Sequence, residues 1–350
     1  MNRRVYSFIF GILMFGKVTS AQPIYQYLTE FEADSPMAIA ADANGGIYFT
    51  SFTFAGPNLS KVYYVADPLG NNALENHQAI IDDDSSPAGR GWHGVAVDDT
   101  GAVYAVLESG TGNTCEVRKL TPAPEFQTDE KFGGGIIMDG QRHNGVTWMG
   151  RDDQGVGYIA LTTFGNCEIW DAEFGGFYKA GVNGESYQRD CDYNPNNGEI
   201  YISTNRDKSG DGLPQRSVNI WRGGSVEDIY AYEDNITNGF IEEGASNTVY
   251  GINNQQIGFD AIHNLIMIAY RDSNNDELNL TVGFYDPADP RHAVMRLDGA
   301  ESPNGPFQNP SDIVTVQTDN GTLLYVTDYD ANRIVVFTTD KTAVGGYMLY

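Results

Sequence analysis

The stretch SDIVTVQTDNGTLLYVTD, residues 311–328, decides the fold class of this chain. Apolar and polar residues alternate on both sides of the turn TDNG, which is the pattern of two strands joined as a β-hairpin. Similar phrases begin at residues 37, 93, 144, 189 and 256, so six hairpins are expected along the 350 residues. Such repetition is typical of proteins built from copies of one supersecondary unit.

Each repeat continues beyond its hairpin with further strand-like runs. In the fourth copy these runs are SVNIW at 217–221 and VEDIYAYE at 226–233. Four strands per repeat, with almost no helical periodicity, predict an all-β, six-bladed β-propeller with four antiparallel strands in each blade. One residue at the centre of each second strand is expected in the core between blades: Tyr48, Tyr104, Tyr158, Tyr201, Met267 and Tyr325.

The sixth repeat lacks a fourth strand, whereas IYQYLTEF at 24–31 precedes the first repeat without a partner. Adding this N-terminal strand to the last blade closes the ring and removes an open sheet edge, so we expect that pairing. The C-terminal GGYMLY at 345–350 is a competing candidate for the same edge. The sequence alone leaves both open.

Residues 1–21 have the pattern of a secretory signal peptide, because a basic start is followed by a 12-residue apolar run and a small-residue exit. We therefore expect a secreted or extracytoplasmic protein with a single propeller over 22–350. The apolar run is too short to span a bilayer and no longer one follows, so no membrane insertion is expected.

The composition narrows the class of partner. The chain has 47 acidic and 21 basic side chains, which give a formal net charge of −26. Such a charge repels phosphate backbones and excludes nucleic acid as the default partner. A protein, a glycan or a small molecule remains as the expected ligand, and we expect a monomer.

The sixth copy also carries a family resemblance. NPSDIVTVQTDNGTLLYVTDYDANRIVVF at 309–337 resembles an NHL repeat, with its Pro-led inner strand, its turn, its YVTD strand and its NRIVVF strand. The match is close in that copy and looser in the other five. The resemblance implies a six-bladed scaffold shared by NHL-type, SMP-30/gluconolactonase-type and strictosidine-synthase-type propellers, and a shared scaffold does not define a function.

The strand order of a blade divides the loops between two faces. Turns between first and second strands lie on one face, here called the turn face. Loops between second and third strands share the other, the loop face, with the connections between blades. The loops between second and third strands vary widely in length and sequence, which favours the loop face as the binding face. One of these loops carries Asp207, Ser209 and Asp211 at the opening spacing of a calcium loop, so Ca²⁺ or another divalent cation is the expected cofactor.

Residues that begin the first strand of each blade are expected to meet at the mouth of a central channel. Convergent polar groups in a cavity form the default site hypothesis, and the candidate catalytic residues there are His93, His143 and Arg189. Alternatively, these side chains have a structural role only and form hydrogen bonds with neighbouring loops.

The SMP-30/gluconolactonase resemblance implies a metal site at the same mouth. Asp34-Ser35-Pro36 resembles the family's E-S-P entrance and Asn144-Gly145 its S-N-G segment, while Pro310-Ser311-Asp312 resembles its P-D-G with the carboxylate displaced by one residue. Trp92-His93-Gly94 departs from the family's N-D-G. The oxygen ligands of such an ion would be Asp34, Asn144, Asp190 and Asp312, with His93 or His143 as the general base.

Two functions follow from these observations. The first is a secreted NHL-like propeller that binds a partner through its loop face and is stabilised by calcium. The alternative is a metal-dependent hydrolase, acting on a lactone or ester, or a lyase, with its site at the channel mouth. The scaffold is clear in the sequence and a catalytic set is not, which favours the binding module.

Overall fold

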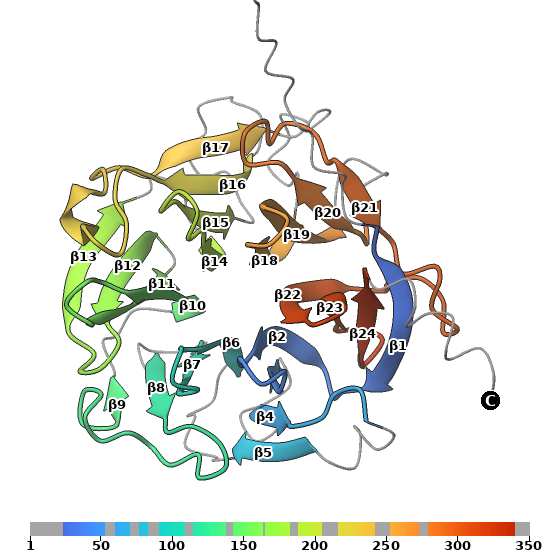
Figure 1. Cartoon of the computed structure of the whole chain (residues 1–350), viewed down its shortest axis with the longest axis horizontal. Coiled ribbons are helices and arrows are strands. Elements are labelled where there is room, and N and C mark those ends of the chain that lie inside the picture. Colours follow the sequence, from blue (N-terminus) through green and yellow to red (C-terminus); the bar gives the residue numbers. More distant parts are fainter. Residues whose placement is uncertain are drawn as a thin grey trace, which may run out of the picture.

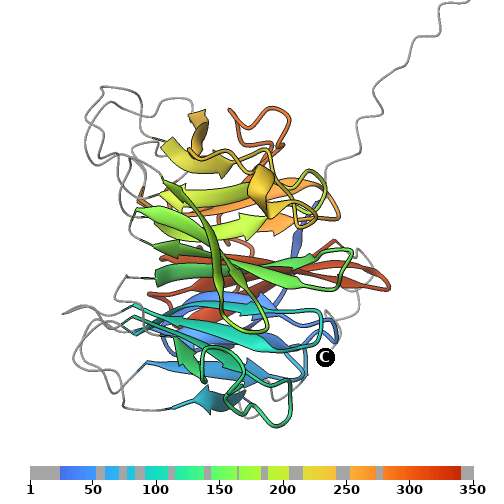
Figure 2. The ribbon, with the colours of Figure 1, turned by 90° about the vertical axis from the view of Figure 1, so that its left-hand side faces the viewer.

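The computed structural model describes residues 24–52, 60–70, 77–82, 91–108, 115–137, 143–163, 165–182, 188–204, 216–241, 253–272 and 279–339. Their strands form six four-stranded antiparallel sheets around a common axis (Figure 1). Seen from the side in Figure 2, the ring is a disc whose hairpin turns lie along the right-hand side, which is the turn face. No helix among these residues is long and apolar enough to cross a membrane.

The blades follow the repeats in chain order, and the strands of each run outward from the axis. Blade one is β2 (Pro36–Ala41), β3 (Ile47–Ser51), β4 (Lys61–Val65) and β5 (His77–Ile81). Blade two is β6 (Trp92–Val97), β7 (Val103–Leu107), β8 (Glu116–Leu120) and β9 (Ile136–Ile137). Blade three is β10 (His143–Arg151), β11 (Gly157–Thr163), β12 (Asn166–Asp171) and β13 (Phe177–Val182).

Blade four is β14 (Gln188–Tyr193), β15 (Ile200–Thr204), β16 (Arg216–Trp221) and β17 (Thr237–Ile241). Blade five is β18 (Asn253–Asp260), β19 (Leu265–Asp272), β20 (Val282–Tyr285) and β21 (Met295–Leu297). Blade six is β22 (Pro310–Thr318), β23 (Gly321–Asp328), β24 (Arg333–Thr338) and, outermost, β1 (Gln26–Glu32). The six-bladed β-propeller predicted from the sequence is confirmed, and so is its closure by the N-terminal strand. The competing segment 345–350 lies outside the described residues.

The fourth strand of blade four was predicted wrongly. Residues 226–233 do not form a strand: they contain a short 3-10 helix, η2 (Ile229–Ala231), and the strand is β17, further along the chain. The Asp228 side chain accepts a hydrogen bond from the backbone N–H of Ala231, which starts the helical turn. Ile229 and Tyr232 bury their side chains between blades three and four, so their apolar character serves the core without a strand.

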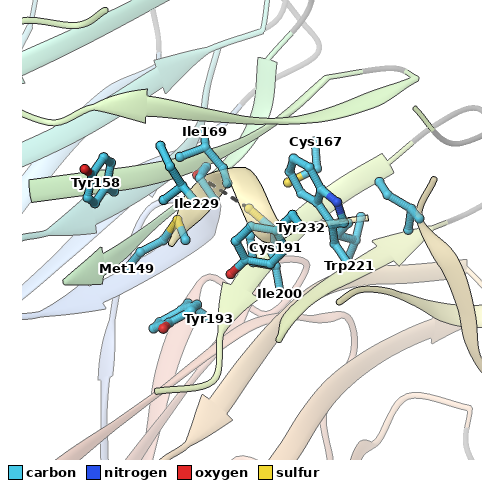
Figure 3. Close-up of a cluster of buried hydrophobic side chains, with 13 residues drawn as sticks. Met149, Tyr158, Cys167, Ile169, Cys191, Tyr193, Ile200, Trp221, Ile229 and Tyr232 are labelled. Atoms are coloured by element: carbon cyan, nitrogen blue, oxygen red, sulfur yellow. Dashed lines mark hydrogen bonds between the residues drawn. The ribbon is translucent and has the colours of Figure 1, made fainter. Parts of the chain in front are cut away.

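The hydrophobic core is divided into six clusters, one at each junction of neighbouring blades. Figure 3 shows the cluster between blades three and four, which includes Cys191, Trp221 and Tyr232. The Cys191 S–H donates to the carbonyl of Ala160 at 3.6 Å. Cys115, Cys167 and Cys191 are all buried and not disulfide-bonded. The six anchors predicted for the inter-blade core are buried in six different clusters, which confirms that prediction.

A hydrogen-bonded unit of Asp and Tyr explains part of the repeat. In blade two, Asp98 Oδ1 accepts the turn N–H groups of Thr100 at 2.8 Å and Ala102 at 3.0 Å, while Asp98 Oδ2 accepts the Tyr104 hydroxyl at 3.0 Å. Blades one and three repeat the arrangement with the pairs Asp42–Tyr48 and Asp152–Tyr158. One carboxylate thus fixes the turn and satisfies a buried hydroxyl.

The closure of the ring depends on Arg333 of β24, which is almost fully buried. Its guanidinium pairs with Asp328 of β23 at 2.9 Å and with Glu30 of β1 at 3.1 Å. The remaining N–H groups donate to the Ser302 hydroxyl and to the carbonyls of residues 305 and 306, each at 2.9 Å. One side chain therefore links three strands of blade six to the connection from blade five.

We expect Arg333→Lys to lower the free energy of unfolding by about 2–3 kcal/mol, because an ammonium cannot reproduce a fork of five donors and leaves buried acceptors unpaired. Arg291→Lys is the matched control, since the Arg291–Asp289 pair is exposed and its replacement should lower the free energy of unfolding far less than Arg333→Lys does. Urea unfolding of both variants measures the difference. Equal losses would show that Arg333 does not hold the closure.

Candidate functional site: the central cavity

The inner strands of the blades surround a cavity of about 230 Å³ on the axis of the ring. All six contribute to its wall, most of them with three consecutive residues: 39–41, 95–97, 146–148, 190–192, 256–257 and 312–314. Consecutive residues of a strand point their side chains to opposite sides, so a wall of this kind is formed largely by the strand edges. The cavity therefore faces N–H and C=O groups that have no neighbouring strand.

Three carboxylates bond these edges across the junctions between blades. Asp312 of β22 accepts the N–H of Ile39 of β2 at 2.7 Å, which joins blade six to blade one. Asp190 and Asp192 of β14 accept the N–H groups of Ile257 at 3.3 Å and Phe259 at 2.6 Å, both on β18. The carboxylates replace a missing strand partner and remain in the cavity wall.

The half of the channel nearer the loop face is filled by buried polar side chains. His93 Nδ1 donates to the carbonyl of Asn144 at 2.8 Å, and the Asn144 amide donates to the carbonyl of Gln188 at 2.6 Å. The Ser311 hydroxyl donates to the carbonyl of Pro36 at 2.9 Å. These bonds join successive inner strands, so His93, Asn144 and Ser311 are buried in contacts between blades.

The predicted catalytic residues do not line the cavity. His93 is 2% exposed and packs edge-on against Phe52, with ring centroids 5.3 Å apart. His143 is fully buried and packs in the same way against Trp170 at 5.7 Å. Arg189 is half-buried on β14. The catalytic assignment of these three residues stays a prediction.

The four predicted metal ligands are brought together only in part. Asp190 and Asp312 both line the cavity. Asn144 is buried in the layer beside it, whereas Asp34 is exposed between β1 and β2 and accepts the Ser35 hydroxyl at 3.2 Å. Among the residues that the structure describes, no group of three His, Cys, Asp or Glu side chains is arranged to hold a metal ion. The calcium loop of Asp207, Ser209 and Asp211 lies outside the described residues.

Close packing between inner strands explains why residue 145 is a glycine, independently of the metal-ligand segment that it resembles. A Cβ at this position would overlap the carboxylate and the Cα of Asp190, and one at Gly94 would come within 2.8 Å of the carbonyl of Asn144. The two glycines let the inner strands of blades two, three and four approach one another. That approach brings Asp190 to the axis.

Exposure along the inner strands shows where the cavity opens. Met37, His93, Asn144 and Ser311, near the loop face, are buried. Further along the same four strands, the wall residues nearer the turn face are partly exposed: Ala41, Val97, Trp148 and Val314. The cavity therefore opens toward the turn face, whereas the variable loops predicted a binding site on the loop face.

The carboxylates repel one another because burial removes the water that would screen them. Burial first, and the charge of Asp312 second, raise the pKa of Asp190 well above its ordinary value. Burial also raises the pKa of Asp312, against the N–H donors of Ile39 and Ile313, which lower it. The pKa of Asp192 is raised by burial to about 6. The wall is thus acidic, and the described residues that line it include no Lys, Arg or His.

Two wall residues were absent from the candidate set. Asp192 stands two positions after Asp190, and strand periodicity alone puts such a pair on the same side. The alternation in RDCDY was therefore a usable signal for this carboxylate. Gln256 is one of four consecutive amide residues in NNQQ at 253–256, and nothing in the sequence distinguishes its amide from the others.

The fold and the cavity define the class of this chain as a six-bladed β-propeller. No protein-family model and no curated protein sequence matches it. The chain is similar to the solved β-propeller domain of Myceliophteria thermophila Cps50 (Swd1), with a TM-score of 0.54 and 7% identity over 90% of this chain and 99% of that one. A solved nidogen/laminin complex matches with a TM-score of 0.48 and 16% identity over 82% and 88% of the two chains. At 7% identity the first likeness concerns the fold alone.

The raised pKa of Asp192 predicts a pH-dependent loss in the Asp192→Ala variant. A carboxyl whose pKa is higher in the folded than in the unfolded state stabilises the fold fully below the unfolded value of about 3.9, and that contribution is lost as the pH rises through about 6. The free energy of unfolding lost on substitution should therefore be larger at pH 4.5 than at pH 7.5, by about 1–3 kcal/mol. Urea unfolding of both proteins at the two pH values measures this loss. A loss that is larger at pH 7.5 would contradict the raised pKa of Asp192.

Proposed function

We propose that this chain is a secreted, non-catalytic binding module that receives its ligand on the turn face, with the central cavity as its pocket. The observation that carries the proposal is the cavity itself. All six inner strands contribute to its wall, it opens toward one face, and its polar groups are fixed by bonds between blades. A pocket held in this way is pre-organised for a ligand. Secretion rests on the leader-like residues 1–21.

A cluster of exposed apolar side chains supports the same face. The turns of blades two, three and four carry Ile136, Phe174, Phe177 and Tyr230, all exposed. These turns touch one another: the N–H of residue 133 donates to the Phe174 carbonyl at 3.0 Å, and the rings of Tyr178 and Tyr230 meet edge-on at 6.3 Å. Exposed apolar groups gathered across several turns mark an interaction surface.

The hydrolase alternative has less support within the described residues. A general base must reach the proton that it abstracts, and His93 and His143 are covered by the packed layer near the loop face. The carboxylates of the cavity wall lie on the other side of that layer. Most of the variable loops of the loop face lie outside the described residues, which include 328–332 of blade six, and binding there stays a prediction.

The two ends of strand β13 provide a matched test of the binding face. Phe177 stands at its turn-face end and Val182 at its loop-face end, and both are exposed, so substitution of either by Ser should leave the melting temperature unchanged. We expect Phe177→Ser to abolish retention of extracellular proteins of the source organism on the immobilised propeller, and Val182→Ser to preserve it. The opposite pattern would move the site to the loop face.

A substrate panel tests the absence of catalysis. Purified protein should hydrolyse lactones and aryl esters no faster with calcium than with EDTA. The Asp190→Ala and Asn144→Ala variants should give the same background rate. Turnover that requires calcium and disappears in both variants would establish the hydrolase and overturn the binding proposal.

A further inference from the structure

We propose that the central cavity binds a protonated alkyl amine, whose ammonium group lies between Asp190, Asp192 and Gln256 while its alkyl chain points to the turn face. This inference rests on the proposed function, because it names the ligand class of the same pocket. The alkylammonium group could belong to a free small amine or to a lysine side chain of a partner protein.

The acidic groups of the wall favour a cation. Asp190, Asp192 and Asp312 line one cavity, and none of the described residues that line it is Lys, Arg or His. Burying several like charges without a counter-ion is costly, and a bound cation removes that cost. The pocket therefore favours a positively charged ligand over a neutral or anionic one.

The side-chain oxygen of Gln256 accepts no hydrogen bond, which favours a cation that carries an N–H group. Gln256 is 1% exposed, lies in the wall, and uses its amide N–H to reach the carbonyl of His93 at 3.3 Å. Its Oε1 has no hydrogen-bond partner within the described part of the chain. A buried acceptor without a donor costs about 1–3 kcal/mol, and an N–H of the ligand would recover it. A quaternary ammonium, which has no N–H, cannot do so.

The remaining wall favours an alkyl chain over a bare metal ion. Ala, Val and Ile residues from blades one, two and three line the side opposite the carboxylates, with Trp148 at the partly exposed end. The volume of about 230 Å³ is several times the share of a single water molecule, about 30 Å³. No three described acidic, His or Cys side chains are placed to coordinate a metal. A short chain that ends in an ammonium group fits both halves of this pocket.

The carboxylates keep acceptor capacity for such a donor. The bond from the Ile257 N–H to Asp190 Oδ2 is long, at 3.3 Å, and the other described donor to this carboxylate is the N–H of Cys191. A carboxylate offers about four acceptor positions on its two oxygens. Asp190 can therefore receive an ammonium N–H without giving up its bond to blade five.

Isothermal titration calorimetry on the full propeller tests the inference with defined probes. We expect n-butylammonium or Nα-acetyl-lysine amide to bind, and tetramethylammonium, n-butanol and calcium chloride to bind at least tenfold more weakly. Binding of both amines identifies a free amine as a sufficient ligand, and binding of the lysine derivative alone identifies a lysine side chain. Gln256→Met should weaken binding about tenfold, since one hydrogen bond to a charged donor is lost.

Gln154→Met, in an exposed turn of the turn face, is the matched control and should bind as the wild type does. Tighter binding of calcium than of either amine, equal binding of tetramethylammonium, or no effect of Gln256→Met would each overturn the inference. Such failure would leave the proposed function intact if Phe177→Ser still abolished partner retention and Val182→Ser did not. If the calorimetric contrast fails while the Phe177→Ser and Val182→Ser contrast holds, the ligand class is wrong and the binding face is right.

Discussion

The inner edges of six strands face a common axis, and their N–H and C=O groups have no seventh element with which to pair. Buried backbone groups without partners are costly, so a propeller must fill its axis with side chains, water or ligand. Near the loop face the axis of this chain holds side chains, and Asn144, His93 and Ser311 bond the neighbouring strands there. Toward the turn face it leaves a cavity, and there carboxylates perform the same task with charge.

That choice makes the axis asymmetric. Asp190, Asp192, Gln256 and Asp312 come from blades four, five and six, whereas blades one and two present Ile, Ala and Val to the cavity. The glycines at positions 94 and 145 draw the intervening strands close, which brings Asp190 against blade three. Six nearly equivalent blades thus form a pocket with an acidic side and an apolar side, because substitutions at equivalent positions break the symmetry of the ring.

The fold could be predicted because its determinants are local and repeated. The turn carboxylate and the tyrosine six residues later, as in Asp98 and Tyr104, recur at a fixed spacing, and their hydrogen bond lies within one hairpin. The error at residues 226–233 has the opposite cause. The run VEDIYAYE is rich in residues that suit a strand, and only packing against a neighbouring blade decides that Ile229 and Tyr232 are buried from a helical turn.

The site was predicted less well, because its residues are defined by contacts between blades. Asp190 and Asp312 were identified from their position at the start of an inner strand, and both line the cavity. The position one residue earlier, in blades two and three, is that of His93 and Asn144, which the structure places in the packed layer instead. A difference of one residue along a strand decides between these outcomes, since it reverses the side to which a residue points. The register of each inner strand against its neighbours, which no single repeat encodes, therefore determines which polar groups remain available to a ligand.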